Sequence, residues 1–293
     1  MLTGRMENWR TLYPFEPKEL LTPDGFRQSY LDEGEGFPVV MLHGIPTWSF
    51  MYRGLVRDLS KDRRCIAPDN IGCGLSEKPQ HWTYRLEGHV RNLEHLLDNQ
   101  LAVDQMDLVL HDWGGPIGMG YAVKHPEKIR RIVLMNTVAF LSNDVPWGIH
   151  LVRAPLLGAL LVRGCNLLVR TAMHRAVNRP LPSDVAAGYA FPYGNWHDRI
   201  ATQRFAQDIP FDNRHPSYPT FLHIQEKLHL LADRKILICW GDRDFCFPPR
   251  FLDRWKAFFP DAEIRHFPDA SHYLLEDEPN DVMRLIRCFL VSI

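Results

Sequence analysis

Short apolar runs that alternate with helix-like stretches are the feature that most constrains the fold of this 293-residue chain. The runs are nearly continuous in apolar residues, as strands are when both faces of their sheet are covered. Their alternation with helical stretches predicts a mostly parallel sheet with crossover helices on both faces. The expected strands are residues 38–42, 64–68, 107–110, 131–135, 235–240 and 263–267. The clearest expected helices are residues 87–97, 115–124 and 281–291.

The composition is that of a globular chain with a neutral charge balance. Hydrophobic residues make up 45% and charged residues 24%, so a large core can form without disulfides or metals. Lys plus Arg number 34 and Asp plus Glu number 35, for a net charge of −1. Because nucleic-acid binders usually carry a basic excess, we expect no nucleic-acid partner. The near-neutral charge suits a small apolar substrate.

The cysteines and the apolar segments indicate in which cellular compartment the protein is expected. The six cysteines form no CxxC pair and mostly lie in apolar runs, as buried reduced thiols do. The first residues contain no apolar segment of the kind found in signal peptides. The longest uncharged run, residues 36–52, is too short for a membrane helix and contains two prolines. We therefore expect a cytoplasmic protein without an integral membrane segment.

One interval, residues 138–228, breaks the alternation. Residues 147–170 are rich in Leu and Val with spaced arginines, which indicates amphipathic helices in a helical insertion or at a membrane surface. The rest is rich in aromatic residues, and Tyr189, Tyr193 and Trp196 are candidates for a pocket wall. An insertion after a strand covers a pocket at the carboxyl edge of a sheet. We expect a core of residues 1–137 and 229–293, with a helical cap of residues 138–228 after the sixth strand.

The strand at 107–110 runs directly into the sequence His111-Asp112-Trp113-Gly114-Gly115 and then into a helix. A strand, a sharp turn and a helix with glycines after the turn form a nucleophile elbow. The apex residue is Asp112, and the chain contains no GxSxG, which disfavours a serine hydrolase. The alternative is that Asp112 only caps the helix.

Later strands are followed by an acid and a histidine. Asp244 follows the strand at 235–240, and His272 follows the strand at 263–267. The chain order of nucleophile, acid and base is the order found in α/β-hydrolases. We therefore expect Asp112, Asp244 and His272 to form a catalytic triad.

An oxyanion hole is expected beside the elbow. The sequence His43-Gly44-Ile45 follows the strand at 38–42. A loop at this place supplies one backbone N–H, and the residue after the nucleophile supplies the other. These donors would be the backbone amides of Ile45 and Trp113.

These motifs together resemble the haloalkane dehalogenase-like branch of the α/β-hydrolase superfamily. The residues that carry the resemblance are 43–50, 68–79, 111–115 and 270–272. In that family the elbow aspartate attacks an sp3 carbon to form an alkyl-enzyme ester, and the following Trp donates its indole N–H to the leaving group. The resemblance implies these roles for Asp112 and Trp113, with an α/β-hydrolase fold and no metal or organic cofactor.

The chain departs from the dehalogenase pattern at Ile45. Many members carry Asn there as the second halide donor, and others use a cap Trp, for which Trp147 and Trp196 do not clearly match. Loss of one donor should cost about 1–3 kcal/mol, or up to about a hundredfold in rate. A further variant places the acid at the position of Asn136, which is not an acid, so Asp244 keeps that role.

The cap narrows the resemblance. Residues 180–182, 188–193 and 195–210 resemble the cap of the β-lactone decarboxylases of bacterial olefin biosynthesis. The resemblance implies a long-chain cis-β-lactone as substrate, with an alkene and CO2 as products. The alternatives are a haloalkane dehalogenase, an epoxide hydrolase that uses paired cap tyrosines such as Tyr189, Tyr193 and Tyr218, and a non-catalytic receptor. A homo-oligomer or a complex with pathway enzymes stays open.

Overall fold

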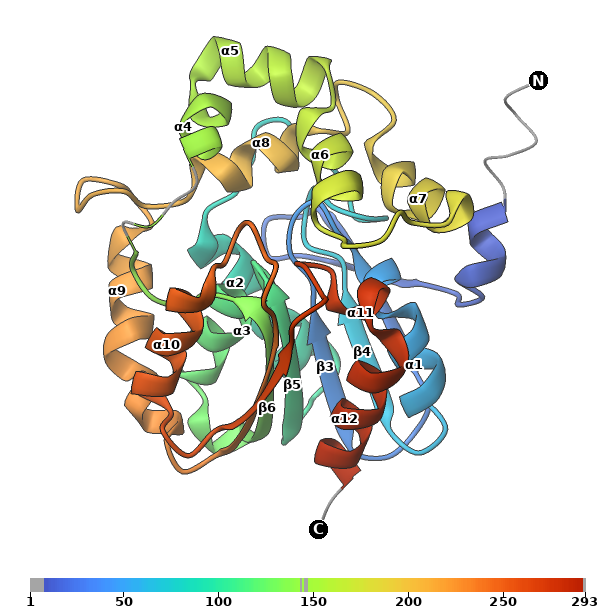
Figure 1. Cartoon of the computed structure of the whole chain (residues 1–293), viewed down its shortest axis with the longest axis vertical. Helices are drawn as coiled ribbons and strands as arrows, with labels where there is room; N and C mark the ends of the chain where they lie inside the picture. Colours follow the sequence, from blue (N-terminus) through green and yellow to red (C-terminus); the bar gives the residue numbers. More distant parts are fainter. Residues whose placement is uncertain (1–7, 143, 145–146, 292–293) are drawn as a thin grey trace.

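The computed structural model describes residues 8–142, 144 and 147–291, without the side chains of Asn8 and Trp147. A twisted sheet forms the centre, and a layer of helices lies above one end of its strands (Figure 1). The strand order is β1-β2-β4-β3-β5-β6-β7-β8. β1 pairs antiparallel with β2 and β2 antiparallel with β4, whereas the other pairs are parallel. The mostly parallel α/β fold expected from the sequence is confirmed.

The six expected strands are all present, and some extend further than expected. The eight strands are β1 (Lys18–Leu21), β2 (Arg27–Glu33), β3 (Pro38–Leu42), β4 (Arg64–Pro68), β5 (Met106–Asp112), β6 (Ile129–Thr137), β7 (Lys235–Gly241) and β8 (Glu263–Phe267). The hairpin of β1 and β2 was not expected, because its strands are rich in polar and charged residues. Such a composition suits the edge of a sheet, where β1 has a single partner strand.

Alternate residues of the central strands enter two different cores. Leu108 and Leu110 of β5 pack in one apolar cluster, whereas Val109 packs in the other. Because successive side chains of a strand point to opposite faces, a strand that is apolar throughout requires helices on both faces. This requirement explains why helices cover the sheet on both sides.

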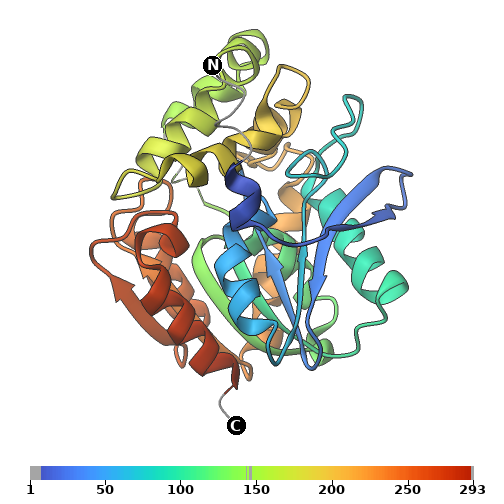
Figure 2. The same cartoon turned by 90° about the vertical axis from the view of Figure 1, so that its right-hand side faces the viewer.

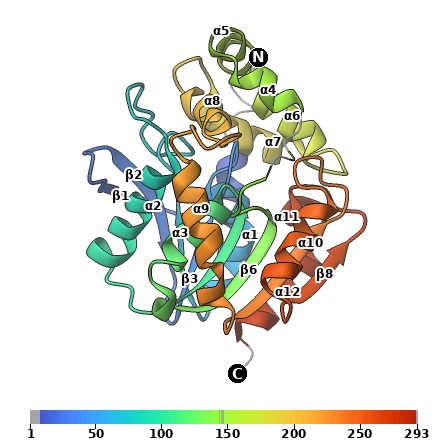
Figure 3. The same ribbon diagram turned by 90° about the vertical axis from the view of Figure 1, so that its left-hand side faces the viewer.

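Helices of the core fall into two groups. The first face is covered by α2 (Leu86–Glu94), α3 (Gly114–Ala122), α9 (Tyr218–Lys227) and α10 (Pro249–Phe258). Three of these helices, α2, α3 and α9, lie in front of the sheet in Figure 3. The opposite face is covered by α1 (Arg53–Leu59), α11 (Leu274–Asp277) and α12 (Pro279–Val291).

The helices above the sheet follow β6, the sixth strand, as expected. They are α4 (Trp147–Arg153), α5 (Pro155–Ala159), the π-turn η6 (Leu160–Gly164), α6 (Leu167–Arg175), α7 (Ser183–Ala190) and α8 (Ile200–Gln207). They lie beyond the carboxyl ends of the strands in Figure 1 and in the perpendicular view of Figure 2. α9, although within residues 138–228, packs against α3 of the core. The division of the chain into core and cap stays a prediction.

Several short helical segments, of the 3-10 or π type, connect these elements. They are η2 (Asn8–Leu12), η3 (Ser49–Tyr52), η4 (His95–Gln100), η5 (Pro126–Lys128), η7 (Phe191–Tyr193) and η8 (Leu228–Leu231). In the described residues, no single helix is long and apolar enough to cross a membrane. Two consecutive helical segments reach the length and apolar composition of a membrane span only when taken together. They are Pro155–Gly164 and Leu167–Arg175, and the chain bends by 61° between them.

Candidate active site

Asp112 lies at the sharp turn between β5 and α3. Its φ angle is +49°, a left-handed conformation that costs a non-glycine residue free energy. The Thr137 hydroxyl donates a hydrogen bond of 2.5 Å to the Asp112 carbonyl. A Cβ built on Gly44 would overlap the Asp112 carboxylate, so only glycine lets the loop after β3 approach this closely. The geometry is that of the expected elbow.

The alternative interpretation, in which Asp112 only caps α3, is not supported. The N-cap residue of α3 is Trp113, and it makes no side-chain capping bond. The Asp112 carboxylate instead turns toward the loop after β3. Its Oδ1 accepts a hydrogen bond of 2.7 Å from the backbone N–H of Ile45, and the Trp113 amide also hydrogen-bonds to the carboxylate. Both predicted amides therefore meet at Asp112.

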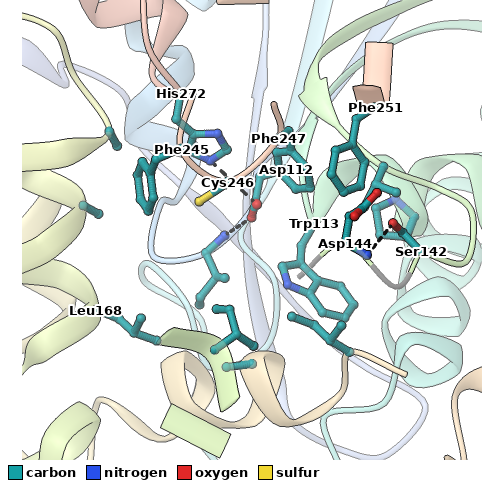
Figure 4. A pocket seen from close by; sticks show the side chains of 18 of the residues that line it. Asp112, Trp113, Ser142, Asp144, Leu168, Phe245, Cys246, Phe247, Phe251 and His272 are labelled. Atoms are coloured by element: carbon teal, nitrogen blue, oxygen red, sulfur yellow. Dashed lines mark hydrogen bonds and ion pairs between the residues drawn. The ribbon is translucent and has the colours of Figure 1, made fainter. Parts of the chain in front are cut away.

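His272 and Asp244 join Asp112 from the ends of the next strands. Asp244 Oδ2 lies 2.8 Å from His272 Nδ1. On its other side, His272 Nε2 lies 3.7 Å from Asp112 Oδ2, and Figure 4 shows the two side chains facing each other. The structure brings all three predicted side chains together, and all three are buried.

Asn136, at the end of β6, positions the acid. Its side-chain N–H groups donate hydrogen bonds of 2.8 Å to Asp244 Oδ2 and of 3.1 Å to the carbonyl of Gly241. Its Oδ1 accepts a hydrogen bond of 2.8 Å from the backbone amide of Gly241. The second Asp244 oxygen, Oδ1, accepts hydrogen bonds from the backbone amides of Cys246 and Phe247. The sequence marked Asn136 only as a missing acid. Its place directly after the strand expected at residues 131–135 was the available signal.

Burial and neighbouring charges shift the pKa values of the two facing groups. Burial raises the pKa of the Asp112 carboxyl, against the opposing effects of His272 and of the Ile45 and Trp113 amides. For His272, burial acts to lower the pKa, but the carboxylates of Asp244 and Asp112 outweigh it, so the pKa is raised. His272 therefore keeps its proton to higher pH than an ordinary histidine does.

An apolar cavity of about 190 Å³ opens beside Asp112 and His272. Its core side is formed by residues that follow β3, β5, β6, β7 and β8, and its outer side by aliphatic residues of α4, α6 and the segment around α8. The outer wall includes Ile149, Leu168, Ala172, Ala206 and Ile209. Such small or aliphatic side chains carry no chemical signal in a sequence, so sequence reasoning missed them.

Trp113 lies in the wall of this cavity, directly after Asp112 (Figure 4). The rings of Phe205 and Phe221 pack edge-on against its indole, at centroid distances of 5.1 and 6.0 Å. No group in the described part of the chain accepts a hydrogen bond from its indole N–H. The nitrogen faces the cavity in Figure 4, where it can donate to a bound molecule.

The three cap residues predicted for the pocket wall do not line this cavity, which corrects that expectation. The Tyr189 hydroxyl donates a hydrogen bond of 2.5 Å to Glu276, and the buried Tyr193 hydroxyl points to the carbonyl of Thr47. Trp196 is 48% exposed on the surface. The physical reason is that α7, which carries Tyr189, packs on η2 and η3, beside the cavity rather than over it.

Comparison with known proteins agrees with the fold and the site. A family model described as alpha/beta hydrolase fold matches residues 38–279. The cis-3-alkyl-4-alkyloxetan-2-one decarboxylase of Shewanella oneidensis is 42% identical over 288 residues, which cover 96% of this chain and 90% of that protein. Haloalkane dehalogenase 2 of Mycobacterium tuberculosis is 31% identical over 280 residues, which cover 94% and 95% of the two chains.

A solved structure shows the same architecture. The crystal structure of an ancestral haloalkane dehalogenase superimposes with a TM-score of 0.83 at 26% identity, covering 92% of this chain and 96% of that one. The chain therefore belongs to the α/β-hydrolase fold family, in its haloalkane dehalogenase-like branch. The cis-β-lactone decarboxylase of Shewanella oneidensis is similar to it over nearly the whole length of both chains.

Proposed function

We propose that this protein is an enzyme that uses Asp112 as a nucleophile on a long-chain cis-β-lactone and releases an alkene and CO2. The observation that carries the proposal is the Asp112 carboxylate, held by the Ile45 amide and facing His272 at an apolar cavity. Such a site occurs here in a chain 42% identical to an enzyme named for decarboxylation of a cis-3-alkyl-4-alkyloxetan-2-one, which is a β-lactone.

The proposed chemistry balances without water or a cofactor. Asp112 Oδ2 attacks the ring carbon that bears the lactone oxygen, the carbon–oxygen bond breaks, and the electron pair leaves as a carboxylate. The bond from the neighbouring carbon to this carboxylate then breaks to release CO2. Its electron pair forms the alkene while the ester bond to Asp112 breaks and returns a pair to the aspartate. The indole N–H of Trp113 would stabilise the carboxylate that forms in the first step.

Ile45 favours a carboxylate over a halide as the leaving group. Its side chain lies at the cavity and has no hydrogen-bond donor. A halide that leaves with a full, compact charge depends on more than one donor, whereas the lactone carboxylate stays covalently attached and spreads its charge over two oxygens. A haloalkane dehalogenase is the second candidate, because 31% identical relatives carry that name and the same site can form an alkyl ester.

The remaining alternatives lose support. An epoxide hydrolase would use paired cap tyrosines, but Tyr189 and Tyr193 make their hydrogen bonds away from the cavity, and Tyr218 does not line it. A non-catalytic receptor would not need Asp244 and His272 aligned with Asp112. We further propose that residues 138–228 act as the cap of a cytoplasmic enzyme. Association with itself or with enzymes that supply the lactone stays part of this proposal.

A direct comparison of substrates tests the function. The purified protein and its Asp112→Asn variant are given a cis-disubstituted long-chain β-lactone or a 1-bromoalkane. We expect alkene and CO2 from the lactone, weak bromide release from the bromoalkane, and neither from the variant, because an amide cannot act as the nucleophile. Fast bromide release from the bromoalkane, with no alkene formed from the lactone, would favour the dehalogenase. Normal turnover by Asp112→Asn would overturn both.

A further inference from the structure

The outer surface of α5 and η6 is apolar. Residues 155–162, with the sequence PLLGALLV, contain no polar side chain. Leu156 is 88% exposed, Leu160 is 58% exposed and Leu157 is 47% exposed, whereas Gly158 and Val162 are buried. Positions 156, 157 and 160 fall on one face of a helix. The helix therefore buries one apolar face in the cap and leaves a second apolar face in solvent, which is unusual for a surface helix.

This apolar face lies at the end of the molecule that is farthest from the C-terminus. α5 forms the outermost element of the cap in Figures 1 and 3. Trp196 lies close to Gly164 at the end of η6, and the guanidinium of Arg163 is 4.7 Å from its ring centroid. An exposed Trp beside exposed leucines matches the amphipathic aromatic residues that settle at a membrane–water boundary.

The chain segment that carries this face is rich in arginine and contains no acidic residue. Residues 145–183 contain no Asp or Glu, although the whole chain has a net charge of −1. The same segment contains five arginines, and none of them forms an ion pair with a described acidic residue. These arginines are Arg153, Arg163, Arg170, Arg175 and Arg179. This segment thus combines exposed leucines with an excess of cationic side chains, the pattern of a helix that binds an anionic lipid surface.

A small cluster of apolar side chains lies between this face and the cavity. Val152 and the inward-facing Val162 of η6 form a small apolar cluster with Ala206. Ile149 and Leu168 pack against that cluster and also line the cavity beside Asp112. These side chains form an apolar connection between the helices beneath this face and the cavity.

We propose that the outer face of α5 and η6 docks this protein on the surface of a bilayer that contains anionic lipids. The inference goes beyond the proposed function and does not depend on the substrate. A second copy of the chain is a poorer occupant, because a twofold contact would place the two arginine-rich segments against each other. A bilayer supplies both an apolar layer for Leu156 and Leu160 and phosphates for the arginines.

Cosedimentation with lipid vesicles tests the proposal. The full chain is mixed with vesicles of phosphatidylcholine alone or of phosphatidylcholine with phosphatidylglycerol, at low and high salt. We expect binding to the anionic vesicles that weakens at high salt. The double variant Leu156→Ser/Leu160→Ser should reduce binding about tenfold or more, since each change removes an inserted leucine. Arg163→Glu/Arg170→Glu should reduce binding to the anionic vesicles specifically.

Matched controls separate docking from changes in folding. Leu21, which is 61% exposed on β1, provides the apolar control Leu21→Ser, and the exposed Lys61 and Arg284 of the core provide the charge control Lys61→Glu/Arg284→Glu. Both controls should bind vesicles like the unaltered protein. Absence of binding to either vesicle, or equal loss in the controls, would overturn the proposal. Concentration-dependent dimers that disperse in Leu156→Ser/Leu160→Ser would assign the face to a second copy instead.

Discussion

At the scale of single residues, the most informative group is His272. Its two ring nitrogens face two carboxylates, Asp244 at 2.8 Å and Asp112 at 3.7 Å. The two candidate reactions require different forms of this imidazole. Hydrolysis of an alkyl ester needs neutral His272 to take a proton from water, whereas fragmentation of a β-lactone moves no proton. Experiments on His272 therefore separate the two functions.

The pH dependence of the two reactions should differ. Burial alone would lower the pKa of His272, but Asp244 and Asp112 raise it above the ordinary value of about 6.5. A raised pKa keeps the imidazole protonated to higher pH, so bromide turnover should increase as pH rises through a pKa above about 6.5. Both reactions need ionised Asp112, whose pKa is also raised, but only hydrolysis needs neutral His272, so the ratio of bromide turnover to alkene formation should rise over the same interval. Rates of both reactions between about pH 5.5 and about pH 9 check this, and a parallel rise in both would contradict it.

Replacement of His272 by Ala should trap the first intermediate of hydrolysis. With a 1-bromoalkane, Asp112 can still form the alkyl ester, but no base activates water to cleave it. Intact-protein mass spectrometry should then show a mass increase equal to one alkyl group on His272→Ala. The Asp112→Asn/His272→Ala double variant serves as the control and should show none. An unmodified His272→Ala protein after prolonged incubation would argue against an ester on Asp112.

Ile45 is expected to limit the use of haloalkanes. Replacement by Asn adds a donor at the cavity beside Asp112 without removing the backbone amide that holds Oδ1. A second hydrogen bond to a leaving halide is worth about 1–3 kcal/mol, so Ile45→Asn should raise bromide release by up to about a hundredfold. Ile45→Val, which adds no donor, is the matched control. Equal rates in the two variants would show that the missing donor is not the limit.

At the scale of elements, a buried ion pair between α1 and α11 also receives a hydrogen bond from α7. Arg53 of α1 makes a two-pronged ion pair with Glu276 of α11, at 2.6 and 2.8 Å. Tyr189 of α7 donates its hydroxyl to the same carboxylate. Because both charged side chains are largely buried, each depends on the other for its solvation. The network explains why Tyr189 supports the cap without entering the cavity.

Removal of Glu276 should therefore destabilise the fold strongly. Glu276→Ala leaves the Arg53 guanidinium buried without its counter-ion, which should lower the free energy of unfolding by about 3–5 kcal/mol. Asp281→Ala, which removes an exposed partner of Arg284, should cost less than about 1 kcal/mol. Urea denaturation followed by circular dichroism compares the two variants. Similar midpoints for both would show that the buried pair adds little.

At the scale of the whole molecule, the site depends on segments far apart in the chain. Loops after β3, β5, β7 and β8 meet at one end of the sheet, since parallel strands place their carboxyl ends together. The helices inserted after β6 close the cavity from above (Figure 1). The same helices carry the outer leucines of α5. One insertion thus forms both the wall of the cavity and the surface proposed to meet a membrane.

Features that rest on local patterns and on chain order can be predicted from the amino-acid sequence alone. The strand, turn and glycines around Asp112 specify an elbow locally, because the backbone at the turn and the close approach of the helix depend on those few residues. The continuous apolar strands specified a sheet covered on both faces. The order of Asp244 and His272 after later strands placed them at the same edge as Asp112.

Which side chains surround the Asp112 carboxylate depends on how the elements pack in three dimensions. Asn136 carries no charge and gains its role only because β6 and β7 are neighbours, so that its amide reaches Asp244. Tyr189 was misplaced because an aromatic side chain suits a cavity wall and a packed interface equally well, and its place depends on how α7 docks. Nothing in the sequence indicated that Leu168 and Ala206 line the cavity, because aliphatic packing is non-directional and depends on shape alone.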